Sequence, residues 1–477
     1  MSSQFEIVIG LEVHAQLMTK TKAFCFVAAK FGEKENSQVG PVSGGLPGAL
    51  PVLNKEAVHL AVRAGIALNC KINERSVFSR KNYFYPDLPK GYQISQFDEP
   101  LCGVGQIDVV ADGHTKTIGI ERIHMEEDAG KSIHLASTTL VNLNRSGTPL
   151  IEIVSKPDMR NAAEAVAYLK KLHSILVFAG ICDGNLEEGN FRCDVNLSVR
   201  PFGQKEFGTR TELKNLNSFR FIEKAIEFES ARQIAVVSSG GKVIQETRGW
   251  DSAAGKTFSQ RTKEEAHDYR YFPEPDLPPL LVTQEYIQDV RKNMPELPEQ
   301  KRARFENDYS LTSYDAEQLT LAKELADYFE KCVKVGATPK SAANWILSEL
   351  LREIKKVEGA DITQSPISPE QIAELISLIE KGTISGKIAK TVFEEMFVSR
   401  KNPTEIVKEK GLVQVLDETA IQEWITKVIQ ENPDVVAEFK QGKEKVFAFL
   451  VGQVMKHSKG KANPGIVGER LRKALLA

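Results

Sequence analysis

The sequence predicts an α+β fold, in which a largely antiparallel sheet domain is followed by all-α parts. Segments near the N-terminus alternate apolar and polar residues with a period of two, as half-buried strands do. Stretches rich in Gly and Pro separate these segments, without the regular alternation of strand and helix that is typical of a doubly wound parallel sheet. From about residue 294 onward, the apolar residues follow helical spacing instead.

Two strands and one helix are expected in the first region. Residues 5–13 alternate from Phe5 to Val13, and the same period places residues 193, 195, 197 and 199 on one face of a second strand. Between them, apolar residues at 165, 169, 172 and 176 predict one face of a helix, and Gly180 is placed to cap its C-terminus.

We expect three domains, at residues 1–293, 294–402 and 403–477. Pro295 and Pro298 mark the first boundary because proline interrupts a helix, and the Pro403 region marks the second. In the all-α parts, helices are expected at residues 316–333 and 369–381. The last helix should have Asn463 as its N-cap and Pro464 at its first position.

The composition is that of a globular protein without a global signal for nucleic acid. The 477 residues are 42% hydrophobic and 26% charged, with a net charge of −2. Six cysteines without a C-x-x-C pair favour reduced thiols in a cytoplasmic protein. No secretory signal or run of 18 apolar residues is present, so we expect no membrane association.

Acidic residues and one histidine predict a site for a hard divalent cation. Glu12 and His14 alternate on the first strand and should face the same way. Glu126, Glu127 and the strand residue Glu152 add carboxylates, which are the ligands that Mg²⁺ prefers. The residues alone leave open a second interpretation, in which these are solvated charges on strand faces.

Two basic stretches are candidates for binding phosphates. Arg80 and Lys81 precede three aromatic residues, so this loop could bind phosphates and stack on a base, or form an aromatic packing corner. Lys214 lies on a polar strand with Glu212, where such residues could position a nucleotide or cap turns. The G-x-x-x-x-G-K-S/T pattern is missing, which excludes a P-loop ATPase.

The C-terminal tail is locally basic. From Lys440 onward, nine Lys and Arg residues stand against two acids, a net charge of +7. Such an excess is typical of a nucleic-acid footprint that supplies salt-sensitive affinity, although a solvated helical face is an alternative. The candidate contacts are Lys440, Lys443, Lys445, Lys456, Lys459 and Lys461.

Long motifs run in order along almost the whole chain. They include IGLEVH at residues 9–14, RKNYFYPD at 80–87, YQISQFD at 92–98, HMEEDAGK at 124–131, LNRSGTPLIE at 143–152, RCD at 192–194, ELKNLNS at 212–218, DYRYFPEPD at 268–276 and FLVGQ at 449–453. Together they resemble the GatB/GatE family, the B subunits of the aspartyl/glutamyl-tRNA(Asn/Gln) amidotransferases.

The resemblance implies a cradle domain related to glutamine synthetase and guanidino kinases, then a helical domain and a tRNA-binding tail. It implies a heterotrimer that also contains an amidase, the A subunit, which frees ammonia from glutamine, and a small C subunit. The B subunit would use ATP to phosphorylate the side-chain carboxylate of Glu on tRNA(Gln) or Asp on tRNA(Asn), and ammonia would then displace phosphate.

The resemblance also implies roles for individual residues. Candidates for Mg²⁺ and catalysis are Glu12, His14, Glu126, Glu127 and Glu152. Candidates for ATP or the substrate carboxylate are Arg80, Lys81, Asp194 and Lys214. Two other functions are kept as alternatives: an RNA-binding scaffold with an inactive cradle, and a carboxylate–amine ligase that acts alone.

One departure from the family concerns zinc. Some members have a zinc knuckle with C-x-C and C-x-x-C pairs near the N-terminus. Here Cys25 is isolated, and Gly40 and Ser43 stand where a second pair would be. We expect no zinc, so the loop at residues 40–48 should be held by packing and hydrogen bonds.

Overall fold

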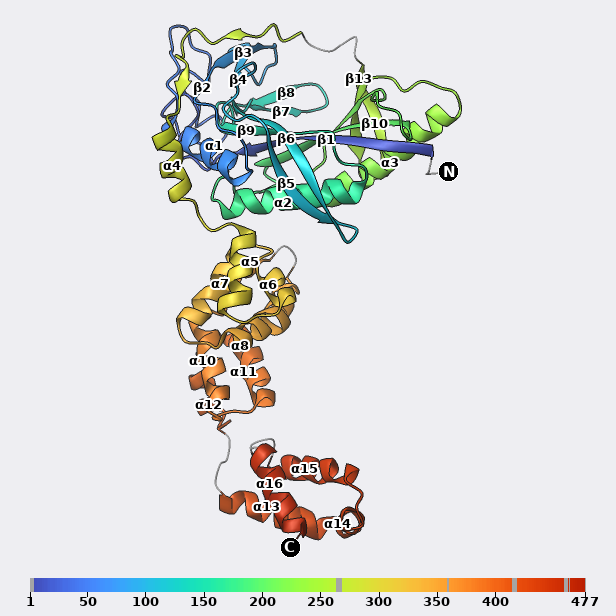
Figure 1. The fold of residues 1–477 in the computed structure, drawn as a ribbon. Helices are drawn as coiled ribbons and strands as arrows, with labels where there is room; N and C mark the ends of the chain where they lie inside the picture. Colours follow the sequence, from blue (N-terminus) through green and yellow to red (C-terminus); the bar gives the residue numbers. More distant parts are fainter. Residues whose placement is uncertain are drawn as a thin grey trace. The chain divides into compact units, whose positions relative to one another are not determined.

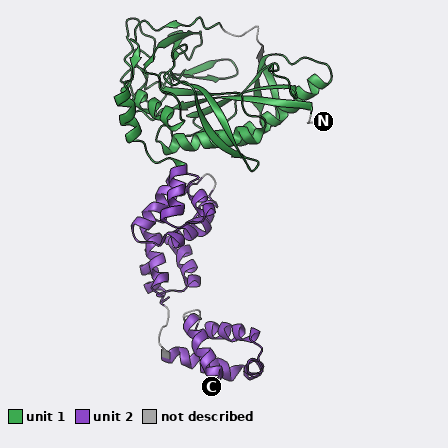
Figure 2. Ribbon diagram, in the orientation of Figure 1, with its two compact units in different colours: residues 1–298 green, residues 299–477 purple. Residues whose placement is uncertain are grey.

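The computed structural model describes residues 4–262, 268–357, 360–413, 418–458, 462 and 464–476. The chain divides into two compact units, Met1–Pro298 and Glu299–Ala477 (Figure 2). The finer division into three domains, at residues 293 and 402, stays a prediction.

A large mixed sheet is the centre of the first unit. Its eight strands among the described residues are β1 (Phe5–Gln16), β5 (Gly105–Ala111), β6 (His114–Glu127), β9 (Pro149–Ser155), β10 (Phe191–Pro201), β11 (Thr211–Lys214), β12 (Glu246–Asp251) and β13 (Lys256–Thr262). Their order is β13-β12-β11-β10-β1-β9-β6-β5 (Figure 1). The pairing is antiparallel except between β11 and β12, which confirms the α+β class and the largely antiparallel sheet.

Shorter strands and four helices complete the described part of this unit. The strands are β2 (Arg75–Ser76), β3 (Phe78–Asn82), β4 (Tyr92–Gln96), β7 (Lys131–His134), β8 (Thr139–Asn142), β14 (Phe272–Pro273) and β15 (Leu280–Leu281). The helices are α1 (Lys55–Ala67), α2 (Ala162–Phe178), α3 (Phe219–Ser238) and α4 (Gln284–Lys292).

The two faces of the large sheet differ because side chains alternate along each strand. Leu11 and Val13 of β1 and Val195 of β10 are buried in the hydrophobic core, to which α2 and α3 contribute (Figure 1). The polar residues between them face the other way. The expected strands and the helix at 165–176 are confirmed, and Gly180 follows α2 with a φ of 63°.

A β-bulge in β6 changes which side chains face the core. Ile120 pairs with Ser155 and Arg122 with Val154, so Glu121 is an extra residue. Before the bulge, buried Ile118 and Ile120 have even numbers; after it, Ile123 and Met125 are the core residues. The bulge therefore turns the polar residues that follow Ile123 toward the polar face.

All the secondary-structure elements described in the second unit are helices. Its helices are α5 (Pro298–Asp308), α6 (Ser313–Leu319), α7 (Lys323–Lys334), α8 (Pro339–Asn344), a π-helical segment (Trp345–Leu350), α9 (Leu351–Ile354), a 3-10 helix (Ile362–Gln364), α10 (Pro369–Glu380), α11 (Gly386–Ser399), α12 (Pro403–Glu409), α13 (Glu418–Glu431), α14 (Pro433–Lys440), α15 (Lys445–His457) and α16 (Pro464–Leu476). No described helix of the chain is long and apolar enough to cross a membrane.

The sequence prediction for this unit was right for one helix and wrong for another. The helix at 369–381 is confirmed as α10, which begins with a capping box formed by Ser368 and Gln371. The single helix expected at 316–333 is wrong, because α6 ends at Leu319 and α7 begins at Lys323. Thr320 donates its hydroxyl to Ala316 O, and this local bond competes with continuation of the helix. The N-cap expected at Asn463 lies outside the described residues.

Candidate active site

The polar face of the sheet brings side chains from four strands into register. His14 of β1 lies opposite Glu152 of β9 on one side and Arg192 of β10 on the other. Glu152 in turn lies opposite His124 of β6. One row further along β1, Glu12 lies opposite Asp194. Residues far apart in the sequence are therefore neighbours, because antiparallel pairing places directly opposed side chains on one face.

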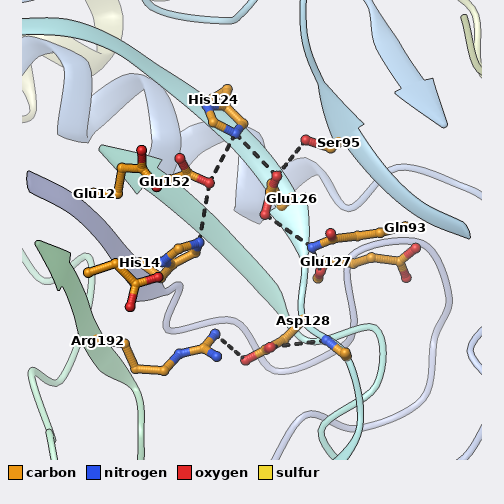
Figure 3. Close-up of polar contacts among 12 residues, drawn as sticks. Glu12, His14, Gln93, Ser95, His124, Glu126, Glu127, Asp128, Glu152 and Arg192 are labelled. Atoms are coloured by element: carbon orange, nitrogen blue, oxygen red, sulfur yellow. Dashed lines mark hydrogen bonds and ion pairs between the residues drawn. The ribbon is translucent and has the colours of Figure 1, made fainter. Parts of the chain in front are cut away.

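The first group of possible metal ligands consists of His14, Glu126 and Glu152. Each residue offers one ligand atom, and these atoms all lie within 4.8 Å of one another. His14 Nε2 lies 3.2 Å from Glu152 Oε2. His124 Nε2 lies 3.2 Å from Glu126 Oε1 and 3.5 Å from Glu152 Oε2, so this imidazole joins the two carboxylates (Figure 3).

A second group lies beside the first on the same sheet. Glu12, Asp194 and Glu212 also offer ligand atoms within 4.8 Å of one another. Asn196 Nδ2 donates to Glu12 Oε1 at 2.9 Å. The ammonium of Lys214 pairs with Asp194 and lies 3.1 Å from Glu212 Oε1, which fixes both carboxylates.

The strand β4 orients the carboxylate of Glu126. Ser95 Oγ donates to Glu126 Oε1 at 2.6 Å, and Gln93 Nε2 donates to Glu126 Oε2 at 3.0 Å (Figure 3). Both donors are buried, so the orientation is set before any ligand binds.

The charges of this cluster depend on one another. Burial alone would raise the pKa of Glu126, but the cations of Lys81 and His124 lower it to about 2. Burial opposes the low pKa of Glu152 in the same way, and the two imidazoles of His124 and His14 outweigh it. These carboxylates are therefore ionised near neutral pH, which is the form that binds a cation.

The pKa values of His124 and Glu12 are raised instead. Burial alone would lower the pKa of His124, but Glu152 and Glu126 raise it to about 9. Burial raises the pKa of Glu12, and the neighbouring carboxylates of Glu152 and Asp194 raise it further. An added positive charge nearby would therefore favour the ionised form of Glu12.

Glu127, a candidate metal ligand from the sequence, is not brought to either group. It is 1% exposed, and its carboxylate pairs with the ammonium of Lys90. The backbone N–H of Ile94 also donates to Glu127 Oε1 at 3.0 Å. The structure thus separates Glu126, in the ligand group, from Glu127, in a buried ion pair.

The two candidate phosphate ligands of β3, Arg80 and Lys81, also have different surroundings. Arg80 forms a bidentate pair with Glu274, at 2.8 and 2.9 Å, and stacks 4.1 Å over the ring of Tyr92. Lys81 lines the same cavity as Glu126, and Glu126 and Glu152 raise its pKa although burial alone would lower it. Its ammonium lies 5.0 Å from the ring centre of Tyr269 and forms no ion pair with the described residues.

A cavity of about 820 Å³ opens over this face of the sheet. Its walls include His14, Glu126 and Asp194 together with the cations of Lys81 and Lys214. The turn at residues 186–190 and the segment 215–217 line it as well. The cavity is large enough for a nucleotide-sized ligand and combines acidic ligand groups with cations.

Sequence reasoning missed several residues that the structure brings to the site. His124 was not singled out, and neither were the cavity residues Arg145 and Arg192. A signal for His124 does exist, because the core residues change from even to odd numbers between Ile120 and Ile123. Such a change indicates a bulge, after which His124 and Glu126 share a face.

The chemistry of the first group fits a magnesium ion. Two carboxylates and one imidazole from three strands leave room for water and phosphate oxygens, which Mg²⁺ usually keeps. No cysteine belongs to either ligand group of the described residues. The loop at residues 40–48 has the hydrogen bonds expected of it, including Gly44 N to Gly40 O at 2.7 Å and Gly40 N to Ser43 Oγ at 3.0 Å.

Two family models match the chain. A family model described as the GatB/GatE catalytic domain matches residues 7–288, and a second, described as a GatB domain, matches residues 327–475. The chain belongs to the GatB/GatE family. The resemblance in the sequence motifs is thereby confirmed.

Relatives within the family match along their whole length. One from Geobacter sulfurreducens is 58% identical over 476 residues, which is 99% of each chain. One from Carboxydothermus hydrogenoformans is 56% identical over 477 residues, again 99% of each chain. One from Persephonella marina is 54% identical over 473 residues, covering 99% of this chain and 100% of its own. All three are named as the B subunit of an aspartyl/glutamyl-tRNA(Asn/Gln) amidotransferase.

The basic residues expected in the tail lie on its helices and turns. Lys440, Lys443, Lys445 and Lys456 are exposed. Lys443 lies 3.5 Å from Glu438, a contact that solvent weakens. Lys459 and Lys461 lie outside the described residues. The helices α13–α16 share one small hydrophobic core, which leaves these lysines on its outside.

Proposed function

We propose that this chain uses ATP to activate the side-chain carboxylate of Glu-tRNA(Gln), Asp-tRNA(Asn) or both, for amidation by ammonia. The observation that supports this most is the pair of ligand groups, His14 with Glu126 and Glu152 and the second group beside it, which share one sheet face. The names of the relatives point to the same substrates, since they describe the B subunit of an aspartyl/glutamyl-tRNA amidotransferase.

The reaction needs a good leaving group on the carboxylate. A carboxylate oxygen of the aminoacyl side chain attacks the γ-phosphorus of ATP, and the bond from this phosphorus to the oxygen of ADP breaks. The ammonia nitrogen then attacks the carbonyl carbon, the bond from carbon to the phosphate oxygen breaks, and phosphate leaves. Phosphoryl transfer of this kind depends on positioning and charge stabilisation rather than on covalent help from the protein.

The residues of the two groups supply that positioning. His14, Glu126 and Glu152 would hold one Mg²⁺, and Glu12, Asp194 and Glu212 would hold a second. Mg²⁺ bound at these groups would neutralise charge on the phosphate oxygens. Ser95 and Gln93 keep Glu126 oriented, and His124 neutralises the carboxylates of Glu126 and Glu152.

Two lysines would act on the transferred group. Lys81 is a cation without an ion pair among the described residues, placed next to the first ligand group. It would stabilise the negative charge that the γ-phosphoryl oxygens carry during transfer. Lys214 is held by Asp194 and Glu212, so its position depends on the second group.

The proposal includes partners and a location. Ammonia would come from an amidase, the A subunit, and a small C subunit would complete a heterotrimer. The exposed lysines of the tail would bind the tRNA backbone, with an affinity that falls as salt rises. We place the protein in the cytoplasm, and no zinc is required.

The experiment uses the purified complex with labelled Glu-tRNA(Gln) and Asp-tRNA(Asn), with and without ATP and the amidase partner. The proposal predicts amide on the tRNA only when ATP, the amidase partner and glutamine are all supplied. Absence of ATP hydrolysis in the presence of Mg²⁺ and the charged tRNA would instead favour an RNA-binding scaffold with an inactive cradle. Amide formed from glutamine without the amidase partner would favour a ligase that acts alone.

A further inference from the structure

Two arginines of the cavity converge on one buried carboxylate. Arg192 Nη2 donates to Asp128 Oδ2 at 2.9 Å, and Arg145 Nε lies 3.6 Å from the same oxygen. Gln16 Nε2 also donates to Asp128 Oδ2, at 2.8 Å, and Ala129 N donates to Oδ1 at 3.0 Å. Asp128 is only 4% exposed, so it belongs to the wall rather than to the open space.

This arrangement lies next to the acidic ligand groups. Arg192 is opposite His14 in the pairing of β10 with β1, and it precedes Asp194 by two residues on the same strand. Figure 3 shows Arg192 and Asp128 below His14, on the side away from Glu126. Both arginines line the same cavity as His14 and Glu126 of the first ligand group and Asp194 of the second.

The turn at residues 185–190 lies against the side chains of both arginines. Gly189 has a φ of 77°, which favours glycine, and a Cβ at this position would lie 3.9 Å from Arg192 Cδ and 4.0 Å from Arg145 Nη1. The two side chains therefore border the same stretch of backbone.

The protein uses only part of the hydrogen-bonding capacity of these arginines. Arg145 donates from Nε to Ala129 O at 2.9 Å and from Nη2 to Gly130 O at 2.7 Å, which leaves Nη1 for a ligand. Arg192 Nε is buried and has no acceptor among the described residues. The side chains of Arg145 and Arg192 are 30% and 37% exposed, and both guanidinium groups face the carboxylate of Asp128.

We propose that Arg145 and Arg192, oriented by Asp128, form a subsite for phosphate oxygens of the nucleotide. The planar guanidinium group binds phosphate through two parallel hydrogen bonds, and two such groups can bind adjacent oxygens. This inference rests on the proposed function and deepens it. It adds that protein side chains, rather than metal ions, bind the phosphates on one side of the ligand groups. A terminal phosphodiester of the tRNA offers the same chemistry, and the experiment separates the two sources.

Asp128 is a positioning residue for this subsite. It holds Arg192 through one oxygen and limits the directions that Arg145 can take. Removing its charge would make the subsite more positive, so simple electrostatics predicts tighter binding of an anion. Loss of orientation predicts weaker binding, and the two explanations therefore differ in sign.

The test measures the dissociation constant of a non-hydrolysable ATP analogue with Mg²⁺ by calorimetry, on the full-length chain in its amidotransferase complex. The same samples are titrated with Glu-tRNA(Gln) in a filter-binding assay. The variants are Arg192→Gln, Arg145→Gln and Asp128→Asn. Arg160→Gln is the matched control, because Arg160 pairs with Glu6 and does not line the cavity.

We expect Arg192→Gln and Arg145→Gln each to raise the dissociation constant of the analogue about tenfold to a hundredfold, as the loss of a charge-assisted hydrogen bond does. Asp128→Asn should also lower the affinity for the analogue, and Arg160→Gln should leave this affinity unchanged. Affinity for Glu-tRNA(Gln) should stay within about twofold, since separate sites give nearly independent effects. Should Arg192→Gln lower the melting temperature sharply, Arg192→Lys replaces it, because lysine keeps the charge but not the planar fork.

The inference is overturned if the arginine variants bind the analogue as wild type does, whether or not they lose affinity for the tRNA. Tighter binding by Asp128→Asn would reject the positioning role. The outcome is distinct from failure of the proposed function, in which the wild-type complex itself does not bind the analogue with Mg²⁺.

Discussion

Glu126 and Glu127 follow one another in β6, and the pleat of the strand turns their carboxylates in different directions. Glu126 accepts hydrogen bonds from Ser95 and Gln93 and lies in the first ligand group. Glu127 is enclosed with Lys90, and the side chains of this ion pair are 1% and 5% exposed. Two identical side chains thus have different roles because their surroundings differ.

The matched substitutions Glu126→Gln and Glu127→Gln should change different properties, the first the affinity for Mg²⁺ and the second the stability of the fold. Glu126→Gln should lower Mg²⁺ affinity at least about tenfold with little change in stability, since it removes one charged ligand. Glu127→Gln leaves the ammonium of Lys90 buried without its partner, which should cost about 3–5 kcal/mol of unfolding free energy. Calorimetric Mg²⁺ titration and urea unfolding measure the two effects, and a loss of metal affinity only in Glu127→Gln would reverse our assignment.

Glu12→Gln or His14→Ala should abolish carboxylate phosphorylation and leave tRNA binding near normal. Each removes a ligand atom from one group, and we expect the rate to fall at least about a hundredfold, as it does when one group that stabilises a transition state is lost. The rate of ADP formation in the presence of Glu-tRNA measures this. Gel-shift titration of the same variants provides the control, and tRNA affinity lost together with rate would indicate general misfolding.

At the scale of single residues, only part of the site could be predicted from the sequence. The period of two correctly placed Glu12 and His14 on one face, because side-chain direction is a local property of a strand. It could not show that Asp194 and Glu212 join Glu12, since the register between strands depends on contacts over long sequence separations. The choice between Glu126 and Glu127 depended on the bulge at Glu121, which shifts the pattern by one residue.

Among the elements, β6 shows how one extra residue positions a site. The bulge at Glu121 lets Ile118 and Ile120 face the core before it and Ile123 and Met125 after it. Without the extra residue, the segment that carries His124 would face the opposite way. Bulges beside active sites commonly re-aim side chains in this manner.

A buried lysine joins α5 to α7 in the helical unit and gives a prediction for pH. Lys301 lies 3.1 Å from Asp327 and 2.7 Å from Glu330. Burial alone would raise the pKa values of both carboxyl groups, but hydrogen bonds from Lys323 and Lys301 lower that of Asp327, and those from Lys301 and Arg304 lower that of Glu330. Because the folded-state pKa is the lower one, the unfolded chain binds more protons in acid.

The stabilisation from this network should therefore be complete above about pH 4.5, near the ordinary pKa of Glu, and should be lost as the pH falls through the lowered folded-state values. Lys301→Met should lower the local stability at pH 7 by about 1–3 kcal/mol, because two carboxylates lose a charged donor. Urea-dependent hydrogen exchange of α5 and α7 peptides, at pH 7 and pH 3.5, measures both effects. Equal acid sensitivity in wild type and Lys301→Met would contradict this account.

The break between α6 and α7 shows what helical patterns leave undetermined. Apolar residues continue across it with helical spacing, from Leu319 through Ala322 and Ala326 to Phe329. The interruption comes instead from the three residues between the helices, in which Thr320 is the C-cap of α6 and Ala322 is the N-cap of α7, in an extended conformation. Neither Gly nor Pro marks the break, so the sequence signal that usually predicts a helix end is missing.

For the whole molecule, the ligand groups and the basic tail belong to different compact units. All described residues of the cavity lie in the first unit, and the lysines from Lys440 onward lie in the second. Removal of the tail should therefore impair tRNA binding without impairing the phosphorylation reaction. Additivity of distant sites supports this expectation.

Deleting residues 403–477 should weaken tRNA binding while ADP formation at saturating Glu-tRNA is retained. The lost affinity should be the salt-dependent part, and each lost lysine–phosphate contact should make the slope of log K against log salt shallower by about 0.7–0.9. Filter binding between about 50 and 200 mM salt measures the slope.

Replacing Lys440, Lys443, Lys445 and Lys456 with Gln in the full chain is the corresponding point test. It should make the slope shallower by up to about 3, since four contacts at most are removed. An unchanged slope in both variants would mean that the tail does not bind the tRNA.

The central claim is that the carboxylate of the aminoacyl group becomes phosphorylated at this sheet face. The measurement that tests it most directly uses Glu-tRNA(Gln) with ¹⁸O in the side-chain carboxylate, incubated with the complete complex, ATP and glutamine. Mass spectrometry of the released phosphate should show one ¹⁸O atom for each amide formed with wild-type protein, and neither amide nor labelled phosphate with Glu152→Gln. Amide formed with phosphate that carries no ¹⁸O would show that the carboxylate oxygen never attacked phosphorus, and would contradict the account.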